Sequence, residues 1–144
     1  MAKIRFGIIG VGMMGRTHLS NLIKNQNAEV IAVCARTKSK VEAFQKEFDI
    51  PYAYTDINEM MSNTEIDAVV VASGANAHKE ACIAACTAGK HIFCEKPLAK
   101  TIDDCIEIEM AASMNSDKFF TVGFMRRFDP SYSEAKQKIK QGQI

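Results

Sequence analysis

Three glycines near the start of the chain have the spacing of a phosphate-binding turn. Gly10, Gly12 and Gly15 spell G-x-G-x-x-G directly after the apolar run 4–10 and directly before a helical stretch from residue 14 to about residue 24. In such a turn the first glycine permits the tight bend and the second lets a pyrophosphate approach the backbone. The third lets the helix pack closely against the strand. The pattern therefore predicts a dinucleotide-binding loop.

The residues after the second glycine would begin the helix. Backbone amide groups at a helix start attract anions, so we expect those of Met13 and Met14 to face the phosphates. A plain glycine turn in a domain that binds something else is the alternative interpretation.

The residue that closes the second apolar run bears on which dinucleotide binds. An acidic side chain there accepts a hydrogen bond from the ribose 2′-hydroxyl and repels a 2′-phosphate. In this chain the run 29–35 ends in Ala35, and Arg36 follows at once. A guanidinium at this edge suits a 2′-phosphate, so we expect NADP to be preferred over NAD. An ordinary solvated loop is the alternative.

The elements that would position these residues alternate along the chain. The strongest apolar runs are nearly continuous, as strands covered on both faces should be, and they span residues 4–10, 29–35, 67–73, 91–95 and 119–124. A weaker run, 51–55, begins with a proline, which suits an edge strand. Helical segments lie between the runs. This order predicts an α/β fold, a Rossmann-type doubly wound parallel sheet in a single domain.

For two of the predicted helices the residue spacing indicates which side chains should be buried. Residues 76–89 place small and polar side chains at helical spacing, namely His78, Ala81, Cys82, Ala85 and Cys86, and the segment ends at Gly89. Residues 101–115 begin at Thr101, a suitable N-cap, and we expect Ile102, Cys105 and Ile106 to form the apolar stripe that packs on the sheet.

The composition excludes several classes of partner. The 144 residues carry 18 Lys and Arg against 17 Asp and Glu, a net charge of +1 without blocks of like charge, so neither a nucleic acid nor a membrane surface is favoured. Five cysteines without a C-x-x-C pair fit free thiols in a reducing compartment, and with no targeting signal we expect a cytoplasmic protein. Cys82 and Cys86 are better explained as packing groups than as metal ligands, and we expect no metal site.

Two further motifs give the chain a family resemblance. The segment "FCEKPLA", residues 93–99, follows the fourth long apolar run, and "VGFMRRFDPSY" covers residues 122–132. Together with the glycine loop they resemble the Gfo/Idh/MocA oxidoreductases, the family of glucose–fructose oxidoreductase and inositol dehydrogenase. The resemblance covers the whole chain and is strongest toward the inositol dehydrogenase branch.

The resemblance implies roles for the E-K-P segment. In the family its lysine lies beside the nicotinamide and the substrate hydroxyl, which makes Lys96 the candidate catalytic residue and places Glu95 at the cofactor site. The carboxyl end of a parallel strand is also where doubly wound sheets bind ligands. An exposed loop lysine with no such role is the alternative. The family often has a cis peptide bond before this proline.

The loop "SGANAH", residues 73–78, replaces the family's usual T-P-x-x-x-H. The resemblance assigns Ser73, Asn76 and His78 to the cofactor site, although Gly74 stands where proline is usual and makes these contacts less fixed. His78 could equally cap the helix or pack beneath the loop. Arg126 resembles an arginine near the substrate of inositol dehydrogenases.

Family members continue into a second α/β domain that completes the active site and carries oligomer contacts. The resemblance therefore implies that residues 1–124 are the Rossmann domain. Residues 125–144, with a helix from Ser131 to Gln141, would lead into a substrate domain absent from this sequence.

Two functions from different classes follow. The first is the cofactor-binding half of an NAD(P)-dependent oxidoreductase that transfers a hydride between the nicotinamide and a sugar or polyol. We expect its full-length form to be a homo-oligomer and the isolated half to be inactive. The second is a non-catalytic dinucleotide-binding or redox-sensing module. Lys96 favours the enzyme, because binding alone does not require E-K-P.

Overall fold

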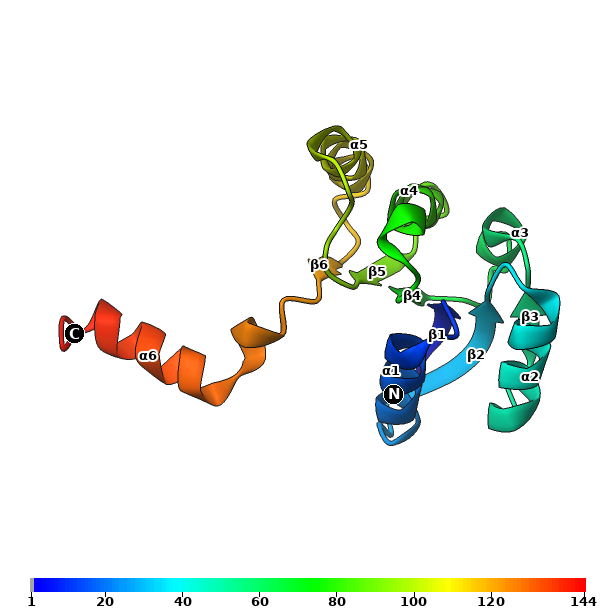
Figure 1. Ribbon diagram of the computed structural model, residues 1–144, viewed down its shortest axis with the longest axis horizontal. Helices are drawn as coiled ribbons and strands as arrows, with labels where there is room; N and C mark the ends of the chain where they lie inside the picture. Colours follow the sequence, from blue (N-terminus) through cyan, green and yellow to red (C-terminus); the bar gives the residue numbers. More distant parts are fainter. Residues whose placement is uncertain (1) are drawn as a thin grey trace.

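The computed structural model describes residues 2–144, and they form one sheet of parallel strands with helices on both faces (Figure 1). The strands are β1 (Ile4–Ile9), β2 (Ala28–Cys34), β3 (Tyr52–Tyr54), β4 (Ala68–Val71), β5 (His91–Cys94) and β6 (Phe120–Val122). Their order across the sheet is β3-β2-β1-β4-β5-β6, and each neighbouring pair is parallel. The predicted doubly wound fold is confirmed, and β3 is the edge strand that its proline indicated.

The helices divide between the two faces because crossovers are right-handed and the strand order runs in both directions from β1. On one face lie α1 (Met13–Ile23) and α2 (Lys38–Phe48). On the other lie α3 (Ile57–Met61), α4 (His78–Thr87) and α5 (Ile102–Ser113). Each face has its own apolar core, one built around Phe44 and Leu19 and the other around Met60 and Ile92.

The face of α4 is the one that the sequence predicted. Its buried residues are His78, Ala81, Cys82, Ala85 and Cys86, and the turn that ends it uses Gly89 at a φ of +66°. Cys82 and Cys86 therefore serve as packing groups. Among residues 2–144, we find no group of His, Cys, Asp and Glu that could hold a metal ion.

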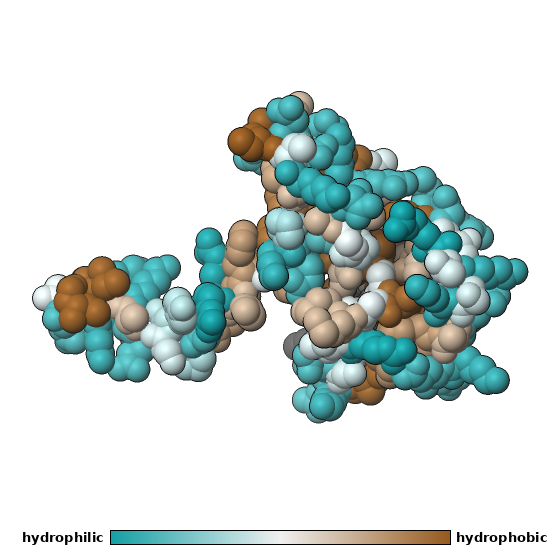
Figure 2. Space-filling view, in the orientation of Figure 1, coloured by the Kyte–Doolittle hydropathy of each residue, from teal (hydrophilic) through white to brown (hydrophobic). Residues whose placement is uncertain are grey.

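The apolar stripe predicted for α5 is wrong at both isoleucines, whereas Cys105 is partly buried. Ile102 is 78% exposed and Ile106 47% exposed, whereas Ile108 is 1% exposed. The helix is turned so that Ile108, Ala111 and Ala112 face the core. Small alanines let α5 approach α4 closely, and the larger side chains are left on the outer side, where Figure 2 shows apolar surface over this helix. The predicted N-cap is confirmed, since the Thr101 side chain accepts a hydrogen bond from the Asp104 amide at 3.1 Å.

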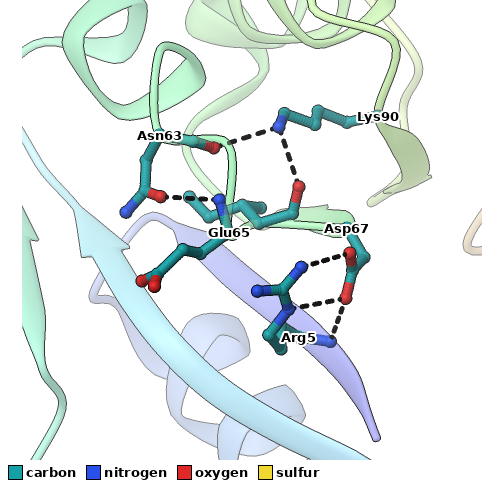
Figure 3. Close-up of polar contacts among 6 residues, drawn as sticks. Arg5, Asn63, Glu65, Asp67 and Lys90 are labelled. Carbon is teal, nitrogen blue, oxygen red and sulfur yellow. Dashed lines mark hydrogen bonds and ion pairs between the residues drawn. The ribbon is translucent and has the colours of Figure 1, made fainter. Parts of the chain in front are cut away.

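Hydrogen bonds and an ion pair hold the sheet together at the end opposite the glycine loop (Figure 3). The Arg5 guanidinium donates two hydrogen bonds to the Asp67 carboxylate, at 2.9 and 3.1 Å, and the Arg5 amide adds a third at 2.9 Å. The buried Lys90 ammonium donates to the carbonyls of Asn63 and Ile66 at 3.0 and 2.8 Å. These bonds fix the start of β4 beside β1, which sets how the carboxyl ends of the same two strands meet.

The last part of the chain leaves the sheet. After a short 3₁₀ turn, η2 (Met125–Phe128), the helix α6 (Pro130–Lys140) projects away from the body (Figure 1). It begins at Asp129, whose side chain accepts from the Ser131 amide at 3.0 Å, in agreement with the helix predicted for residues 131–141. Every residue of α6 is exposed. None of the helices within residues 2–144 is both long and apolar enough to cross a membrane.

Candidate dinucleotide site

A cavity of about 540 Å³ lies over the carboxyl ends of β1, β2 and β4. The strand order reverses between β1 and β4, the position where doubly wound sheets bind ligands. The lining comes from the glycine loop, the ends of β2 and β3 and the loop after β4, and comprises Ile9, Gly10, Val11, Gly12, Cys34, Ala35, Arg36, Thr37, Lys40, Thr55, Asp56, Ile57, Ala72, Ser73, Gly74, Asn76, Ala77 and Glu80.

The three glycines of the loop are required for three different reasons. Gly10 has a φ of +108°, and a Cβ there would lie 2.7 Å from the Ala72 backbone. A Cβ on Gly15 would collide with the Gly10 carbonyl oxygen, so this glycine lets α1 pack against β1. At Gly12 a Cβ would meet nothing within 4 Å. The space over Gly12 is therefore open, which is where a pyrophosphate would approach the backbone.

The start of α1 is arranged to receive an anion. Gly12 is its N-cap and supplies no side-chain cap, so the first amide groups of the helix are free for a ligand. Met13 is exposed and Met14 partly buried, and neither side chain is among the residues that line the cavity. Any part they play in binding is through their backbone amides.

The end of β2 places cations at one side of the cavity. Ala35 and Arg36 line it, and Lys40, in the first turn of α2, lines it as well. Sequence analysis missed Lys40. Two carboxylates, Asp56 and Glu80, also line the cavity. Asp56 is partly engaged, because its side chain caps α3 by accepting from the Glu59 amide at 2.9 Å.

The loop after β4 brings polar groups to the opposite side. Ser73 and Asn76 line the cavity. The Ser73 hydroxyl is buried, and within residues 2–144 its oxygen has no hydrogen-bond partner. Since buried polar atoms are almost always paired, this hydroxyl fits a ligand group that enters the cavity. The open space at Gly12 and the free hydroxyl of Ser73 are both what a bound dinucleotide requires.

His78 lies beneath this loop. Its side chain is 1% exposed and does not line the cavity. Its Nε2 is 2.9 Å from the Ser73 carbonyl oxygen and its Nδ1 is 2.9 Å from the Pro97 carbonyl oxygen. His78 was considered as a cofactor contact, as a helix cap and as a residue packed beneath the loop, and the structure places its side chain beneath the loop.

Glu95 connects the E-K-P segment to the glycine-loop helix. It is 9% exposed; one carboxylate oxygen is 2.9 Å from His18 Nε2 of α1, and the other accepts from the Lys96 amide at 3.1 Å. His18 was missed by the sequence analysis, and its only signal is its place on the predicted helix. The Lys96 side chain is exposed, outside the cavity lining, and the Lys96–Pro97 bond is cis as the resemblance implied.

Arg126 is not brought to the cavity. Its guanidinium donates to the Asp129 carboxylate at 2.9 Å and lies over the Tyr132 ring, 4.9 Å from the centroid. The glycine loop, the end of β2 and the loop after β4 are thus the parts that the structure assembles into one cavity.

Comparison with known proteins agrees with this geometry. Residues 4–124 match the sequence model of the Gfo/Idh/MocA group, described as an oxidoreductase family with an NAD-binding Rossmann fold. The chain belongs to this family. Its curated relatives include the inositol 2-dehydrogenase of Acidothermus cellulolyticus, 39% identical over 145 residues, and that of Salmonella typhimurium, 34% identical over 143 residues.

Solved structures of the family superpose closely. The scyllo-inositol dehydrogenase of Lactobacillus casei with bound NAD(H) and scyllo-inositol gives a TM-score of 0.92 at 34% identity. The myo-inositol dehydrogenase of the same organism, in complex with NAD(H) and myo-inositol, gives 0.92 at 35% identity. Each comparison covers 99% of this chain and 42% of the other. The Acidothermus and Salmonella enzymes are covered to 42% and 43% of their lengths, so the chain spans about two fifths of these relatives.

Proposed function

We propose that this chain is the dinucleotide-binding half of an NAD(P)-dependent dehydrogenase of the inositol dehydrogenase type. The observation that carries the proposal is the open space over Gly12 at the strand switch point, with the free amides of α1 behind it. The relatives named above are inositol dehydrogenases, two of them with NAD(H) and an inositol bound, which supports a polyol or sugar as the substrate.

Different residues of the chain would contact different parts of the cofactor and substrate. The backbone from Gly12 to Met14 would bind the pyrophosphate, and Ser73 and Asn76 would contact the cofactor on the β4 side. When bound, the nicotinamide would accept or donate the hydride. Lys96, at the end of β5, would orient the substrate hydroxyl or move its proton, a role for which a lysine beside a cationic ring is suited.

The remaining parts of the site belong to a longer protein in this proposal. Residues 1–124 would form the Rossmann domain, and residues 125–144 would lead into the substrate domain. Arg126 would reach the substrate only there, and the full-length protein would be a homo-oligomer in the cytoplasm. This half alone would bind the cofactor without turning over inositol or a sugar.

Within this function we propose that NADP is bound more tightly than NAD. Ala35 removes the carboxylate that would repel a 2′-phosphate, and Arg36 and Lys40 supply positive charge at the same side of the cavity. A charge-assisted hydrogen bond contributes about 1.5–3 kcal/mol, which corresponds to roughly tenfold to a hundredfold in Kd. Two of the relatives named above have NAD(H) bound, so NAD is the cofactor against which this proposal is tested.

Calorimetric titration of the 144-residue chain with NADP and NAD tests both proposals. We expect NADP to bind at least about tenfold tighter, and Arg36→Ala to remove most of that difference. Lys38→Ala is the matched control, because Lys38 is an exposed cation two residues away that does not line the cavity. Equal affinities, or an Arg36→Ala variant with unchanged NADP affinity, would contradict the NADP proposal. Absence of binding to either dinucleotide would contradict the function itself.

A further inference from the structure

Each ring nitrogen of His78 lies within hydrogen-bond distance of a backbone carbonyl oxygen, which can only accept. The Ser73 carbonyl oxygen is 2.9 Å from Nε2, and the Pro97 carbonyl oxygen is 2.9 Å from Nδ1. A neutral imidazole has one N–H donor and one lone pair, whereas an imidazolium has two donors. Only the protonated ring can therefore satisfy both carbonyls at these distances.

A neutral ring would leave an unfavourable contact in either tautomer. One nitrogen lone pair would then point at a carbonyl oxygen within hydrogen-bond distance, at a side chain that is 1% exposed and out of reach of water. Burial of the charged ring has its own cost, so a compensating anion should lie close by.

The fully buried Cys94 thiol lies where that anion is needed. Its Sγ is 3.5 Å from His78 Nδ1 and 3.4 Å from the Glu95 carbonyl oxygen, to which it donates while it is protonated. The neighbouring Cys82 of α4 and then His78 lower the pKa of Cys94 against the opposing effect of burial. The hydrogen bond with Cys94 is in turn the main cause that raises the pKa of His78 to about 9, against the opposing effect of burial.

Glu95 and Lys79, two charged residues near the pair, are engaged elsewhere. Glu95, next to Cys94, is held by His18 and the Lys96 amide. From α4 and α5, Lys79 pairs with Asp104 and Glu107. Among the described residues, Cys94 is the titratable group with a contact to the His78 ring.

We infer that His78 is a buried imidazolium, paired with a Cys94 thiolate, that ties the loop after β4 to the E-K-P segment and so positions Lys96. The hydrogen bond from His78 Nδ1 holds the carbonyl of Pro97, the residue after Lys96. The hydrogen bond from His78 Nε2 holds the carbonyl of Ser73, in the loop after β4. With the Lys96 amide held from the other side by Glu95, the backbone on both sides of Lys96 is fixed. The importance of Lys96 rests on the proposed function, but the charge on His78 does not.

Nitrogen-15 NMR of the three histidine rings in the full chain tests the charge directly. At about pH 7.5 we expect two protonated ring nitrogens for His78, which should lose one only near pH 9. His91 is the internal control, because its Nδ1 accepts the Phe119 amide at 2.9 Å and must be unprotonated there. In Cys94→Ser the anion is gone, so His78 should lose a proton at a pH at least about one unit lower. A single protonated nitrogen on His78 at neutral pH, or no change in Cys94→Ser, would overturn the inference.

Amide hydrogen exchange of the chain without cofactor tests the positioning role. In Cys94→Ser, at a pH where the His78 ring has become neutral, the Lys96 amide should exchange at least about tenfold faster than in the wild type. The amides of β2 should be unchanged, since they lie in a different part of the sheet. Unchanged Lys96 protection would overturn the positioning role. None of these measurements uses a dinucleotide, so a failure of the proposed function appears separately, as absent NADP and NAD binding.

Discussion

Replacement of Gly12 by valine should abolish dinucleotide binding and leave the fold intact. A Cβ at Gly12 would meet nothing within 4 Å, and the residue has a φ of −78°, which any L-amino acid adopts. The protein itself therefore tolerates the side chain. In the proposed function the pyrophosphate approaches the backbone through this same space, so the two methyl groups would fill the volume that the ligand needs.

The size of the effect follows from the bonds that would be lost. A backbone amide that donates to a phosphate oxygen makes a charge-assisted hydrogen bond worth about 1.5–3 kcal/mol. Two such bonds at the start of α1 amount to about 3–6 kcal/mol, which weakens binding at least about a hundredfold. Calorimetric titration with NADP and NAD measures this loss, and thermal unfolding followed by circular dichroism measures the fold.

Gly15→Ala is the matched control with the opposite expectation. Its Cβ would collide with the Gly10 carbonyl oxygen, so α1 must move away from β1. Overpacking of this kind costs about 1–3 kcal/mol, or a fall in melting temperature of roughly 3–12 °C for a domain of this size. Normal binding by Gly12→Val would refute the reasoning, and so would a Gly12→Val protein that melts as low as Gly15→Ala.

Other predictions concern the core and its charges. Ile108→Ala should lower the free energy of unfolding, measured in urea, by about 2–5 kcal/mol because the side chain is buried. Ile106→Ala, on the outer side of α5, should change it by less than about 1 kcal/mol. Similar losses in the two variants would refute the observed orientation of α5. Arg5 lowers the pKa of Asp67, so the pair stabilises the fold above the unfolded pKa of about 4, and this contribution is lost as the pH falls through the lower folded pKa. Urea unfolding across this acid range should depend less on pH in Asp67→Asn, and an unchanged profile would contradict the assignment. Burial raises the pKa of Cys34 to about 11, so mass spectrometry should find it unmodified by iodoacetamide in the folded chain at neutral pH, and rapid modification would show that the end of β2 opens.

The order of elements could be predicted because each signal was local. Continuous apolar runs mark strands that are buried on both faces, and glycines or caps mark where helices begin and end, as at Gly89 and Thr101. The phase of α5 could not be predicted in this way. Its apolar residues form two lines on the helix, and which line is buried depends on how closely the alanines let α5 approach α4.

The backbone part of the site was also readable from the sequence. A Cβ on Gly10 or Gly15 would collide with backbone atoms, and the space over Gly12 is open, as the predicted phosphate-binding turn requires. Lys40 and Asp56 were missed because neither belongs to a motif. They reach the cavity only because α2 and α3 start at the same edge of the sheet as the glycine loop.

The polar residues of the loop after β4 and of the E-K-P segment show where sequence reasoning stops. Ser73, His78 and Glu95 all come after a strand at the carboxyl edge of the sheet, and the family resemblance assigns all three to the cofactor site. The structure separates them by burial and by hydrogen bonds: the Ser73 hydroxyl is free, whereas His78 and Glu95 are held by protein groups on both sides. A side chain with every polar atom already engaged acts on a ligand only through the residues that it holds. His78 holds the carbonyls of Ser73 and Pro97, and Glu95 holds His18 and the Lys96 amide. A loss of function in variants of His78 or Glu95 should therefore come with a displaced loop rather than with a missing contact.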